Sequence, residues 1–414
     1  MSPLQFSTLA AFDHQPRTRL VFGAGCVERL GALAQEFAGR NVLLVTDPGL
    51  VAAGHADRVR ALLERAGLCV TLFARVQENP TTRCVEDCVS VARAGAVETL
   101  VALGGGSSLD TAKGCNFILT NGGRMQDYWG VGRATQPMLP LIAVPTTAGT
   151  GSECQSAALI ADEQTHQKMA CLDPRAAPRI ALLDPTLTVS QPRRVTACTG
   201  IDAVAHAVEA AVTKKRNAFS LMCAQEAFKL TAPNFPRVLH EPTDLEARGR
   251  MQLGAAFAGM AIEASMLGAA HAAANPLTAH YAMAHGQAVG LMLPHVVRFN
   301  GADPEALRAY RDLASAAEIA HAREGLQPAL DGLVAHLDSL LALTEMPRSL
   351  QDCGVDREAI PTLAEEASRQ WTAQFNPRPV RAEDFQNLYA AAFAAGPATS
   401  GDKGWVTAPH PGRG

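Results

Sequence analysis

The stretch LVALGGGSSLDTAK, from Leu100 to Lys113, joins an apolar run to a helical pattern through three consecutive glycines. The run LVAL is typical of a buried strand, and SLDTAK begins a segment with helical spacing. Glycines at such a turn let backbone amides approach a ligand closely, and the free amides of the following helix attract an anion. The stretch therefore predicts a strand, a turn and a helix that can seat a pyrophosphate. Because it matches neither G-x-G-x-x-G nor a P-loop, a glycine turn without a ligand is the alternative.

Strands and helices alternate on both sides of this stretch. Short apolar runs predict strands within residues 41–47, 69–75, 98–106, 139–153 and 179–185. Helical spacing predicts helices within residues 25–39, 54–67, 82–95 and 108–119. Strands that alternate with helices form a mostly parallel sheet that is covered on both faces. We therefore expect residues 1–190 to form an α/β dinucleotide-binding domain.

The pattern changes after about Pro192, where strand-like runs largely vanish and alanine-rich helical segments follow one another. These segments cover residues 200–215, 219–235, 245–265, 286–300, 306–322, 329–344 and 382–396. A chain of 414 residues exceeds the usual size of one hydrophobic core, so a second domain is expected. The sequence predicts an all-α domain over residues 191–414, with the active site in the cleft between the two domains.

Composition argues against several classes of protein. The net charge of −4 and the lack of a dense basic run argue against nucleic-acid or anionic-membrane binding. No uninterrupted apolar run reaches the roughly 18–20 residues of a membrane span, and residues 1–23 lack the pattern of a signal peptide. The ten cysteines include no C-x-x-C pair, which is typical of free thiols in a reducing compartment. We expect a cytoplasmic globular protein.

Two further turns in the first half place polar residues at strand ends. Asp47 follows the run NVLLVT, a position where a carboxylate commonly binds a ribose 2′-hydroxyl and repels a 2′-phosphate. Its alternative role is that of a helix N-cap ahead of Pro48. The turn PTTAGTGSE, from Pro145 to Glu153, adds hydroxyls and glycines at the end of another strand. These turns predict a dinucleotide across the sheet edge, with NAD(H) preferred over NADP(H).

A candidate metal site lies in the second half. In TGIDAVAHAVEAA, Asp202 and His206 are four residues apart, so a helix places both side chains on one face. Such a pair can share a divalent cation, or it can form a hydrogen bond within the helix. His271 and His285 are too far apart for one helix to bring them together, and Pro276 between them is the candidate for a bend or helix end. One carboxylate and three imidazoles suit Fe²⁺ or Zn²⁺ better than Ca²⁺ or Mg²⁺.

Taken together, these motifs resemble the iron-containing (group III) alcohol dehydrogenases. The resemblance is carried, in order and over nearly the whole chain, by GGGSSLDTAK, PTTAGTGSE, GIDAVAHAVE, LGAAHAAANPL, HGQAVGLMLPHVVRFN, NPRPV and DFQNLYAAAF. It implies a dinucleotide-binding domain, a helical domain and an active site between them. The metal ligands that it implies are Asp202, His206, His271 and His285. The candidate cofactor contacts are Asp47, Asn79, Gly105, Gly106, Ser107, Ser108, Asp110, Thr146, Thr147, Thr150 and Lys168.

One position departs from the family pattern. Many members carry a further histidine four residues after the third metal ligand, whereas this chain has Asn275 there. An amide forms hydrogen bonds but exchanges no proton near neutral pH, so Asn275 cannot itself relay a proton. His280 is a candidate substitute in the catalytic site, and otherwise an ordinary interior or surface histidine. We expect the proton to leave through a water molecule or a cofactor ribose hydroxyl instead.

The sequence thus predicts a metal-dependent oxidoreductase that transfers a hydride between a small-molecule alcohol, aldehyde or ketone and a nicotinamide cofactor. Fe²⁺ is the expected metal, Zn²⁺ is the alternative, and the assembly is expected to be a homodimer or a higher homo-oligomer. A metal-independent reductase of the maleylacetate reductase type would leave the Asp202 carboxylate without a purpose. A dehydroquinate-synthase-like lyase would need clustered Lys and Arg, and few basic residues lie between His206 and His295. A non-enzymatic NAD-binding protein would not need the three imidazoles.

Overall fold

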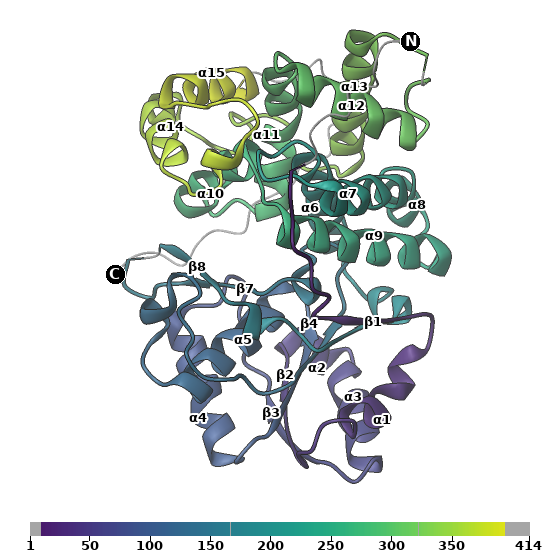
Figure 1. Cartoon of the computed structure of the whole chain (residues 1–414), viewed down its shortest axis with the longest axis vertical. Coiled ribbons are helices and arrows are strands. Elements are labelled where there is room, and N and C mark those ends of the chain that lie inside the picture. The colour runs from purple at the N-terminus through teal and green to yellow at the C-terminus, as the bar shows by residue number, and fades with distance from the viewer. Residues whose placement is uncertain (1–9, 166, 322, 394–414) are drawn as a thin grey trace.

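The polypeptide forms a sheet-based α/β region, at the bottom of Figure 1, and a helical region above it. The computed structural model describes residues 10–165, 167–321 and 323–393. The last strand of the main sheet, β9 (Ile180–Leu183), is followed by a short 3-10 turn and then by the long helix α6 (Arg193–Ala210). The chain is therefore an α/β region followed by a helical region, as the change in sequence pattern predicts.

Six strands form one parallel sheet at the centre of the α/β region. Their order is β1 (Arg19–Phe22), β9, β6 (Leu141–Pro145), β4 (Thr99–Gly104), β2 (Asn41–Val45) and β3 (Cys69–Phe73). Every neighbouring pair runs parallel. The central strands are buried along almost their whole length, which explains their continuously apolar sequences. All six carboxyl ends meet at one edge of the sheet.

Helices cover both faces of this sheet. They are α1 (Leu30–Ala34), α2 (Pro48–Ala52), α3 (His55–Arg65), α4 (Thr82–Ala94) and α5 (Gly106–Asn121). Because side chains alternate along a strand, β4 contributes to two cores. Leu100 and Ala102 pack with residues of α4 and α5, whereas Val101 and Leu103 pack with residues of α1 and α3.

A second, three-stranded sheet lies beside α5 and was not predicted from the sequence. It has the order β5 (Gly130–Val131), β8 (Lys168–Leu172) and β7 (Ala157–Ala161), with β7 antiparallel to β8. Its strands are short and only partly buried, so their apolar pattern is weak. Ile160 and Met169 anchor the sheet in the core around α5.

The helical region is built around α6, which is buried on nearly all sides. The other helices are α7 (Ala218–Thr231), α8 (Asn234–His240), α9 (Leu245–Ala264), α10 (Ala269–Tyr281), α11 (His285–Asn300), α12 (Pro304–Ala316), α13 (Leu326–Leu343), α14 (Ile360–Ser368) and α15 (Ala382–Phe393). α7, α9 and α11 pack against α6. Small side chains such as Ala203 and Ala207, which are fully buried, let these helices approach closely.

The break between His271 and His285 does not lie at Pro276. Pro276 is inside α10, which continues to Tyr281, so of the two possibilities, a bend or a helix end at the proline, the helix end is wrong. A proline costs about 3 kcal/mol inside a helix, and here the surrounding buried residues of α10 outweigh that cost. The chain turns instead at Ala282, whose φ of 49° is left-handed, and α11 begins at His285.

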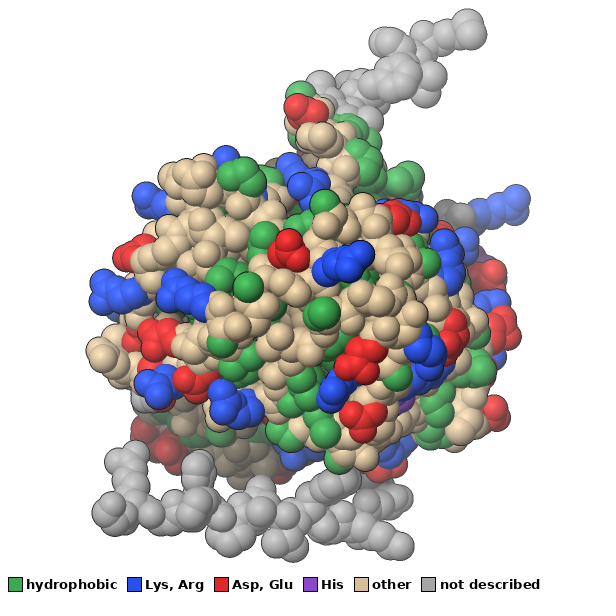
Figure 2. Space-filling model, turned by 90° about the horizontal axis from the view of Figure 1, so that it is seen from below, with side chains coloured by type: hydrophobic (Ala, Val, Ile, Leu, Met, Phe, Trp, Pro, Cys, Tyr) green, Lys and Arg blue, Asp and Glu red, His purple; other side chains and the backbone are tan. Residues whose placement is uncertain are grey.

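The lengths of the described helices and the charges on the surface bear on membrane and nucleic-acid binding. No single helix in the described ranges is long and apolar enough to cross a membrane, although α9 and α10 meet the criterion together as a pair bent by 104°. On the face seen in Figure 2, where the described side chains are visible, Lys and Arg are interspersed with Asp and Glu. That visible face offers no broad patch of a single charge.

Candidate active site

A cavity of about 860 Å³ opens between the carboxyl edge of the main sheet and the helical region. One wall is formed by turns that follow strands of the sheet, and the other by α6, α10 and α11. The lining includes these residues that were predicted from the sequence: Asp47, Asn79, Gly105, Gly106, Ser107, Ser108, Asp110, Thr146, Thr147, Thr150, Lys168, Asp202, His206, His271 and His285. Asn275 and His280 are not among the described residues that line it.

Four side chains converge at the helical end of the cavity. The Nε2 atoms of His206 and His271 lie 3.5 Å from Oδ1 of Asp202, and Nε2 of His285 lies 4.0 Å from the same oxygen. Asp202, His271 and His285 each offer a ligand atom within 4.8 Å of the other two. Neighbouring ligands of a tetrahedral ion with bonds of about 2.1 Å are about 3.4 Å apart. The spacing of these atoms therefore fits a small divalent cation.

The hydrogen-bonding groups at this point lack protein partners. Asp202 Oδ1, His271 Nε2 and His285 Nδ1 are buried and have no hydrogen-bond partner among the described residues. A buried polar atom without a partner costs free energy, so several such atoms around one point require an explanation. A bound cation would satisfy Asp202 and His271 together, and the donor set suits iron or zinc.

Partners behind two of the imidazoles fix their orientation. Nδ1 of His206 lies 3.2 Å from the carbonyl oxygen of Gly149, so it donates and leaves Nε2 free as a lone-pair donor to a metal. Nδ1 of His271 lies 2.5 Å from Glu209 Oε2. Glu209 also accepts from the amide of Ala270 at 2.7 Å, which holds the start of α10 in place. These contacts resemble the carboxylate–histidine arrangements found behind metal ligands.

Burial and mutual charge shift the ionisation of the cluster. Burial alone would raise the pKa of Asp202, but the imidazole of His206 and its neighbours outweigh burial and hold that pKa below its usual range. Burial would lower the pKa of His271, but the carboxylates of Asp202 and Glu209 raise it to about 9. Burial, reinforced by the ammonium of Lys168, lowers the pKa of His285 to about 3. One anionic and several coordinating groups thus share the helical end of the cavity, where Asp202, His206 and His271 are buried and His285 is partly exposed.

Local backbone geometry brings His285 to the other three ligands. The left-handed turn at Ala282 reverses the chain after α10 and places His285 at the first position of α11. The next residue, Gly286, packs directly against α6, because a Cβ atom there would lie 1.9 Å from the carbonyl oxygen of Cys198. The lack of a side chain at Gly286 permits this close approach.

The opposite end of the cavity is formed by the glycine turn before α5. Gly105 is the N-cap of α5, and no described side chain caps the helix. A Cβ atom on Gly106 would lie 2.8 Å from Cγ2 of Thr150, so a larger residue does not fit without movement. Residues 105–108, at the N-terminus of α5, line the cavity beside the hydroxyl-bearing turn that follows β6. This arrangement is typical of an anion seat.

Three polar residues lie along the same side of the cavity. Asp47 is the N-cap of α2, with Oδ1 accepting from the amide of Leu50 at 3.1 Å, and it also lines the cavity. The N-cap role considered for it is therefore observed, while its contact with a ribose stays a prediction. Asn79 is exposed and has a left-handed φ of 52°. The ammonium of Lys168, on β8, reaches the cavity, where loss of hydration lowers its pKa against the opposing attraction of Asp110.

The structure does not bring His280 or Asn275 into the cavity wall. His280 lies on the surface, where Nε2 is 2.8 Å from Oε2 of Glu366 and nearly half of its side chain is exposed. Asn275, one turn beyond His271 on α10, donates to Oε1 of Gln370 at 3.0 Å. The geometry therefore offers no direct contact between either side chain and the converging ligands.

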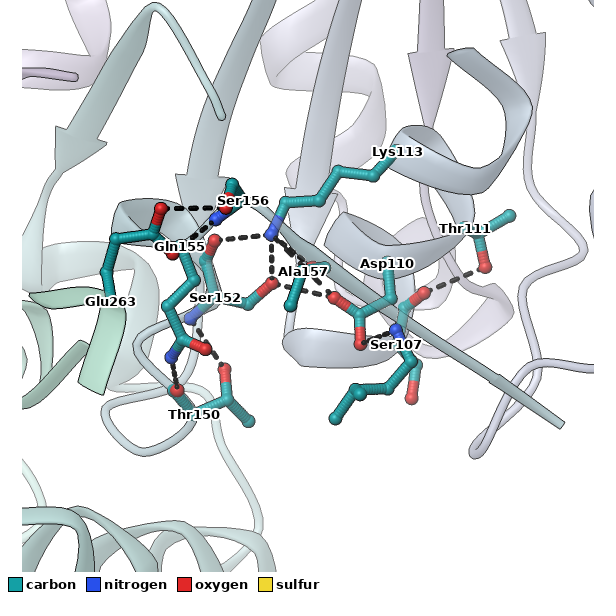
Figure 3. A network of polar contacts seen from close by, with 11 residues as sticks. Ser107, Asp110, Thr111, Lys113, Thr150, Ser152, Gln155, Ser156, Ala157 and Glu263 are labelled. Carbon is teal, nitrogen blue, oxygen red and sulfur yellow. Dashed lines mark hydrogen bonds and ion pairs between the residues drawn. The ribbon is translucent and has the colours of Figure 1, made fainter. Parts of the chain in front are cut away.

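Sequence reasoning missed two residues that support the site. Glu209 follows Asp202 and His206 on the same face of α6, and an acidic residue in an otherwise alanine-rich buried helix is the signal that could have revealed it. Lys113 is fully buried, and its ammonium donates to the turn that follows β6 (Figure 3). Its partners lie far away in sequence, so no local pattern identifies its role.

Comparison with known proteins agrees with this architecture. Residues 16–185 match the family model described as iron-containing alcohol dehydrogenase, and residues 196–393 match the C-terminal model of the Fe-containing alcohol dehydrogenase family. Alcohol dehydrogenase 4 of Schizosaccharomyces pombe is 34% identical over 90% of this chain and 87% of its own length. The 1,3-propanediol dehydrogenase of Klebsiella pneumoniae is 33% identical over 92% of this chain and 99% of its own length.

Solved structures give the same result. A crystal structure of a 1,3-propanediol oxidoreductase superposes with a TM-score of 0.89 at 32% identity, covering 93% of this chain and all of that chain. The sulfoacetaldehyde reductase of Bifidobacterium kashiwanohense, solved in complex with NAD⁺, has a TM-score of 0.83 at 27% identity, over 92% of this chain and 99% of its own. The chain belongs to the iron-containing alcohol dehydrogenase family, and it is an oxidoreductase of alcohols and aldehydes.

Proposed function

We propose that this protein is an NAD(H)-dependent alcohol dehydrogenase whose metal is held by Asp202, His206, His271 and His285. The observation that carries the proposal is the convergence of three imidazole nitrogens, at 3.5–4.0 Å, on one buried carboxylate oxygen that has no hydrogen-bond partner among the described residues. A divalent cation bound there supplies Lewis acidity toward an alcohol or carbonyl oxygen, and a nicotinamide supplies the hydride acceptor or donor.

The residues of this chain perform the positioning. Asp202 contributes the negative charge, and Gly149 and Glu209 hold the rings of His206 and His271 so that their Nε2 atoms face it. The glycine turn at Gly105 offers backbone amides to the pyrophosphate of the cofactor. Around the ligands the cavity wall includes Ile262, Leu267 and Ala284, whose apolar side chains exclude water from the reacting centre. A small uncharged alcohol or aldehyde suits such a wall.

The preference for NAD(H) rests on Asp47. Its carboxylate lines the cavity at the carboxyl end of β2, and Oδ1 is engaged by the amide of Leu50. The second oxygen has no hydrogen-bond partner among the residues that the structure describes and can accept from a ribose hydroxyl, whereas a 2′-phosphate would meet like charge.

The proposal is tested by a panel of alcohols with NAD⁺ or NADP⁺ and a panel of aldehydes with the reduced cofactors. The protein is first stripped with a chelator and then supplied with Fe²⁺ or Zn²⁺, and turnover is followed by the absorbance of the reduced nicotinamide. We expect turnover that depends on the metal and is faster with NAD(H). Equal turnover in the stripped protein would refute the metal-dependent mechanism.

The lyase alternative finds no support in the charges of the cavity. Lys168 and Arg194 are the basic side chains among the described lining residues, and they do not form the cluster that a phosphorylated sugar acid would need.

All ten cysteines are free thiols, which supports a location in the reducing cytoplasm.

A further inference from the structure

A fully buried ammonium lies between the glycine turn and the helical region. Lys113, on α5, is 0% exposed, and burying a charge is unfavourable unless the charge is paired and hydrogen-bonded. Its Nζ donates to the carbonyl oxygen of Ser152 at 2.7 Å, to Oγ of Ser152 at 2.8 Å and to the carbonyl oxygen of Ala157 at 2.9 Å (Figure 3). All three N–H groups are therefore used, and hydride transfer needs none of them.

Asp110 completes the charge balance of this network. Its Oδ1 lies 3.9 Å from Nζ of Lys113 and accepts from Oγ of Ser152 at 2.7 Å, while Oδ2 accepts from the amide of Leu159 at 3.3 Å. Burial lowers the pKa of Lys113, and Asp110 opposes that shift. The ammonium of Lys113, the carboxylate of Asp110 and the hydroxyl of Ser152 thus form a connected hydrogen-bond network that holds the segment from Ser152 to Leu159.

The segment from Ser152 to Leu159 is also held by contacts with α9. On the side facing the helical region, Glu263 of α9 accepts from the amide of Ser156 at 3.0 Å and from its hydroxyl at 2.7 Å (Figure 3). The neighbouring Gly151 touches α9 so closely that a Cβ atom there would lie 2.6 Å from Cα of Gly259. Residues 149–157, which we call the keystone loop, are clamped between α5 and α9.

The keystone loop also contacts a proposed metal ligand. The carbonyl oxygen of Gly149 is the partner of Nδ1 of His206, at 3.2 Å. A hydrogen bond to one ring nitrogen determines where the other nitrogen points, and partners of this kind typically change metal affinity by about 10- to 100-fold. The placement of that carbonyl therefore bears on the metal site.

We propose that Lys113 is a positioning residue for the metal site, which fixes the keystone loop so that Gly149 holds His206 in its ligating orientation. This inference rests on the proposed function, because it presupposes a metal at Asp202 and the three histidines. It gives a dinucleotide-binding helix a second task, which is to organise a ligand on the other side of the cavity.

The direct test measures the Zn²⁺ affinity of the chelator-stripped protein by competition with a chromophoric chelator. In Lys113→Met the ammonium is replaced by an apolar side chain of similar length, and we expect Zn²⁺ to bind about tenfold more weakly, the lower end of the range for such supporting contacts. If Lys113→Met fails to fold, Lys113→Gln, which keeps a donor, is measured instead and should show a smaller loss. Unchanged affinity in the folded variant would overturn the inference.

Asn116→Leu is the matched control. Asn116 is buried on the same helix and exchanges hydrogen bonds with the backbone of Leu139, away from the keystone loop. Both variants should lose thermal stability, but Asn116→Leu should bind Zn²⁺ as the wild type does. An equal loss of affinity in both variants would show general loosening of α5 and refute a specific role of Lys113.

A double-mutant comparison asks whether Lys113 acts through His206. In a His206→Ala background, Lys113→Met should weaken Zn²⁺ binding no further, whereas in a His285→Ala background it should still cause its full loss. The same additional loss in both backgrounds would contradict the path through His206. If the wild type itself does not bind Zn²⁺, the metal assignment fails and the inference fails with it.

Discussion

The two ends of the cavity are built in opposite ways. The imidazole end, formed by Asp202, His206, His271 and His285, consists of side chains from three helices that converge on one point. The glycine end, formed by residues 105–108, consists of backbone at a helix N-terminus, where the lack of side-chain bulk makes the space. The first end depends on which groups are present, and the second depends on which groups are absent. Single substitutions should therefore affect the two ends in different ways.

The largest effect is expected from removing a ligand at the imidazole end. His271→Ala should lose bound metal and lower kcat/KM by about a thousandfold, because Lewis acidity contributes several kcal/mol to such reactions. The fold should survive, since the Glu209 carboxylate still accepts from the amide of Ala270. Metal content by mass spectrometry, circular dichroism and turnover are the measurements. His295→Ala, on the same helix as His285 but outside the cavity lining, should keep its metal; full occupancy in His271→Ala would contradict the ligand assignment.

A larger side chain at the glycine end should weaken NADH binding and leave the metal content of the protein unchanged. In Gly106→Val, the new side chain would overlap Thr150, whose Cγ2 would be 2.8 Å from the added Cβ. Movement of the turn would misplace an amide that binds the pyrophosphate, and losing a hydrogen bond to a charged group costs about 1.5–3 kcal/mol, which corresponds to about 10- to 150-fold weaker binding of NADH. Binding is measured by the fluorescence of the reduced nicotinamide. Gly332→Val on α13 is the control, because a Cβ there meets nothing nearer than Ile319 at 4.0 Å. Normal NADH affinity in Gly106→Val would place the cofactor elsewhere.

These two ends also differ in how much the sequence reveals. The strands of the main sheet except β1, and the helix α5, follow from apolar runs and glycines that are local in the chain. The placement of Asp202 and His206 on one face of α6 follows equally from helical spacing. The convergence of His285 with them does not, because it depends on the left-handed turn at Ala282 and on the contact of Gly286 with Cys198. These are tertiary features, and no periodicity encodes them.

Short strands and residues with distant partners were also missed, because their structure depends on contacts that are not local in the sequence. β7 and β8 are brief, half-buried strands with a polar connection, so their pattern resembles a loop. Lys113 looks like an ordinary helical lysine until Ser152 and Ala157 are seen to surround it. Pro276 suggested a helix end because its local cost is large, but burial of the surrounding helix outweighs that cost.

A smaller effect is expected from removing the charge of Asp47, which should change the preference between NADH and NADPH. Asp47→Gly should raise the use of NADPH relative to NADH, because one unit of like charge at about 4 Å costs about 1 kcal/mol even in water, which is about fivefold. The ratio of kcat/KM for the two cofactors is the measurement. Asp47→Asn keeps the N-cap of α2 and should shift the ratio in the same direction without destabilising the helix. A wild type that already prefers NADPH would show that Asp47 does not contact the ribose.

The smallest effect is expected at His280, which tests whether either end of the cavity extends to the surface of α10. His280 forms an exposed ion pair with Glu366, and such pairs contribute about 0–1 kcal/mol to stability. His280→Phe should therefore leave metal content unchanged and alter kcat by less than about twofold across the pH range, since no proton path through its ring reaches the ligands. Asn275→His, in contrast, adds a titrating group one turn from His271 and should introduce a new inflection near neutral pH in the kcat profile.

A hundredfold loss of kcat in His280→Phe, with metal and KM intact, would mean that α10 moves during turnover and brings this surface imidazole to the reacting centre. If His280→Phe is silent and Asn275→His alone changes the profile, the proton of the alcohol leaves through water or a ribose hydroxyl, and the catalytic end of the cavity stops at His271.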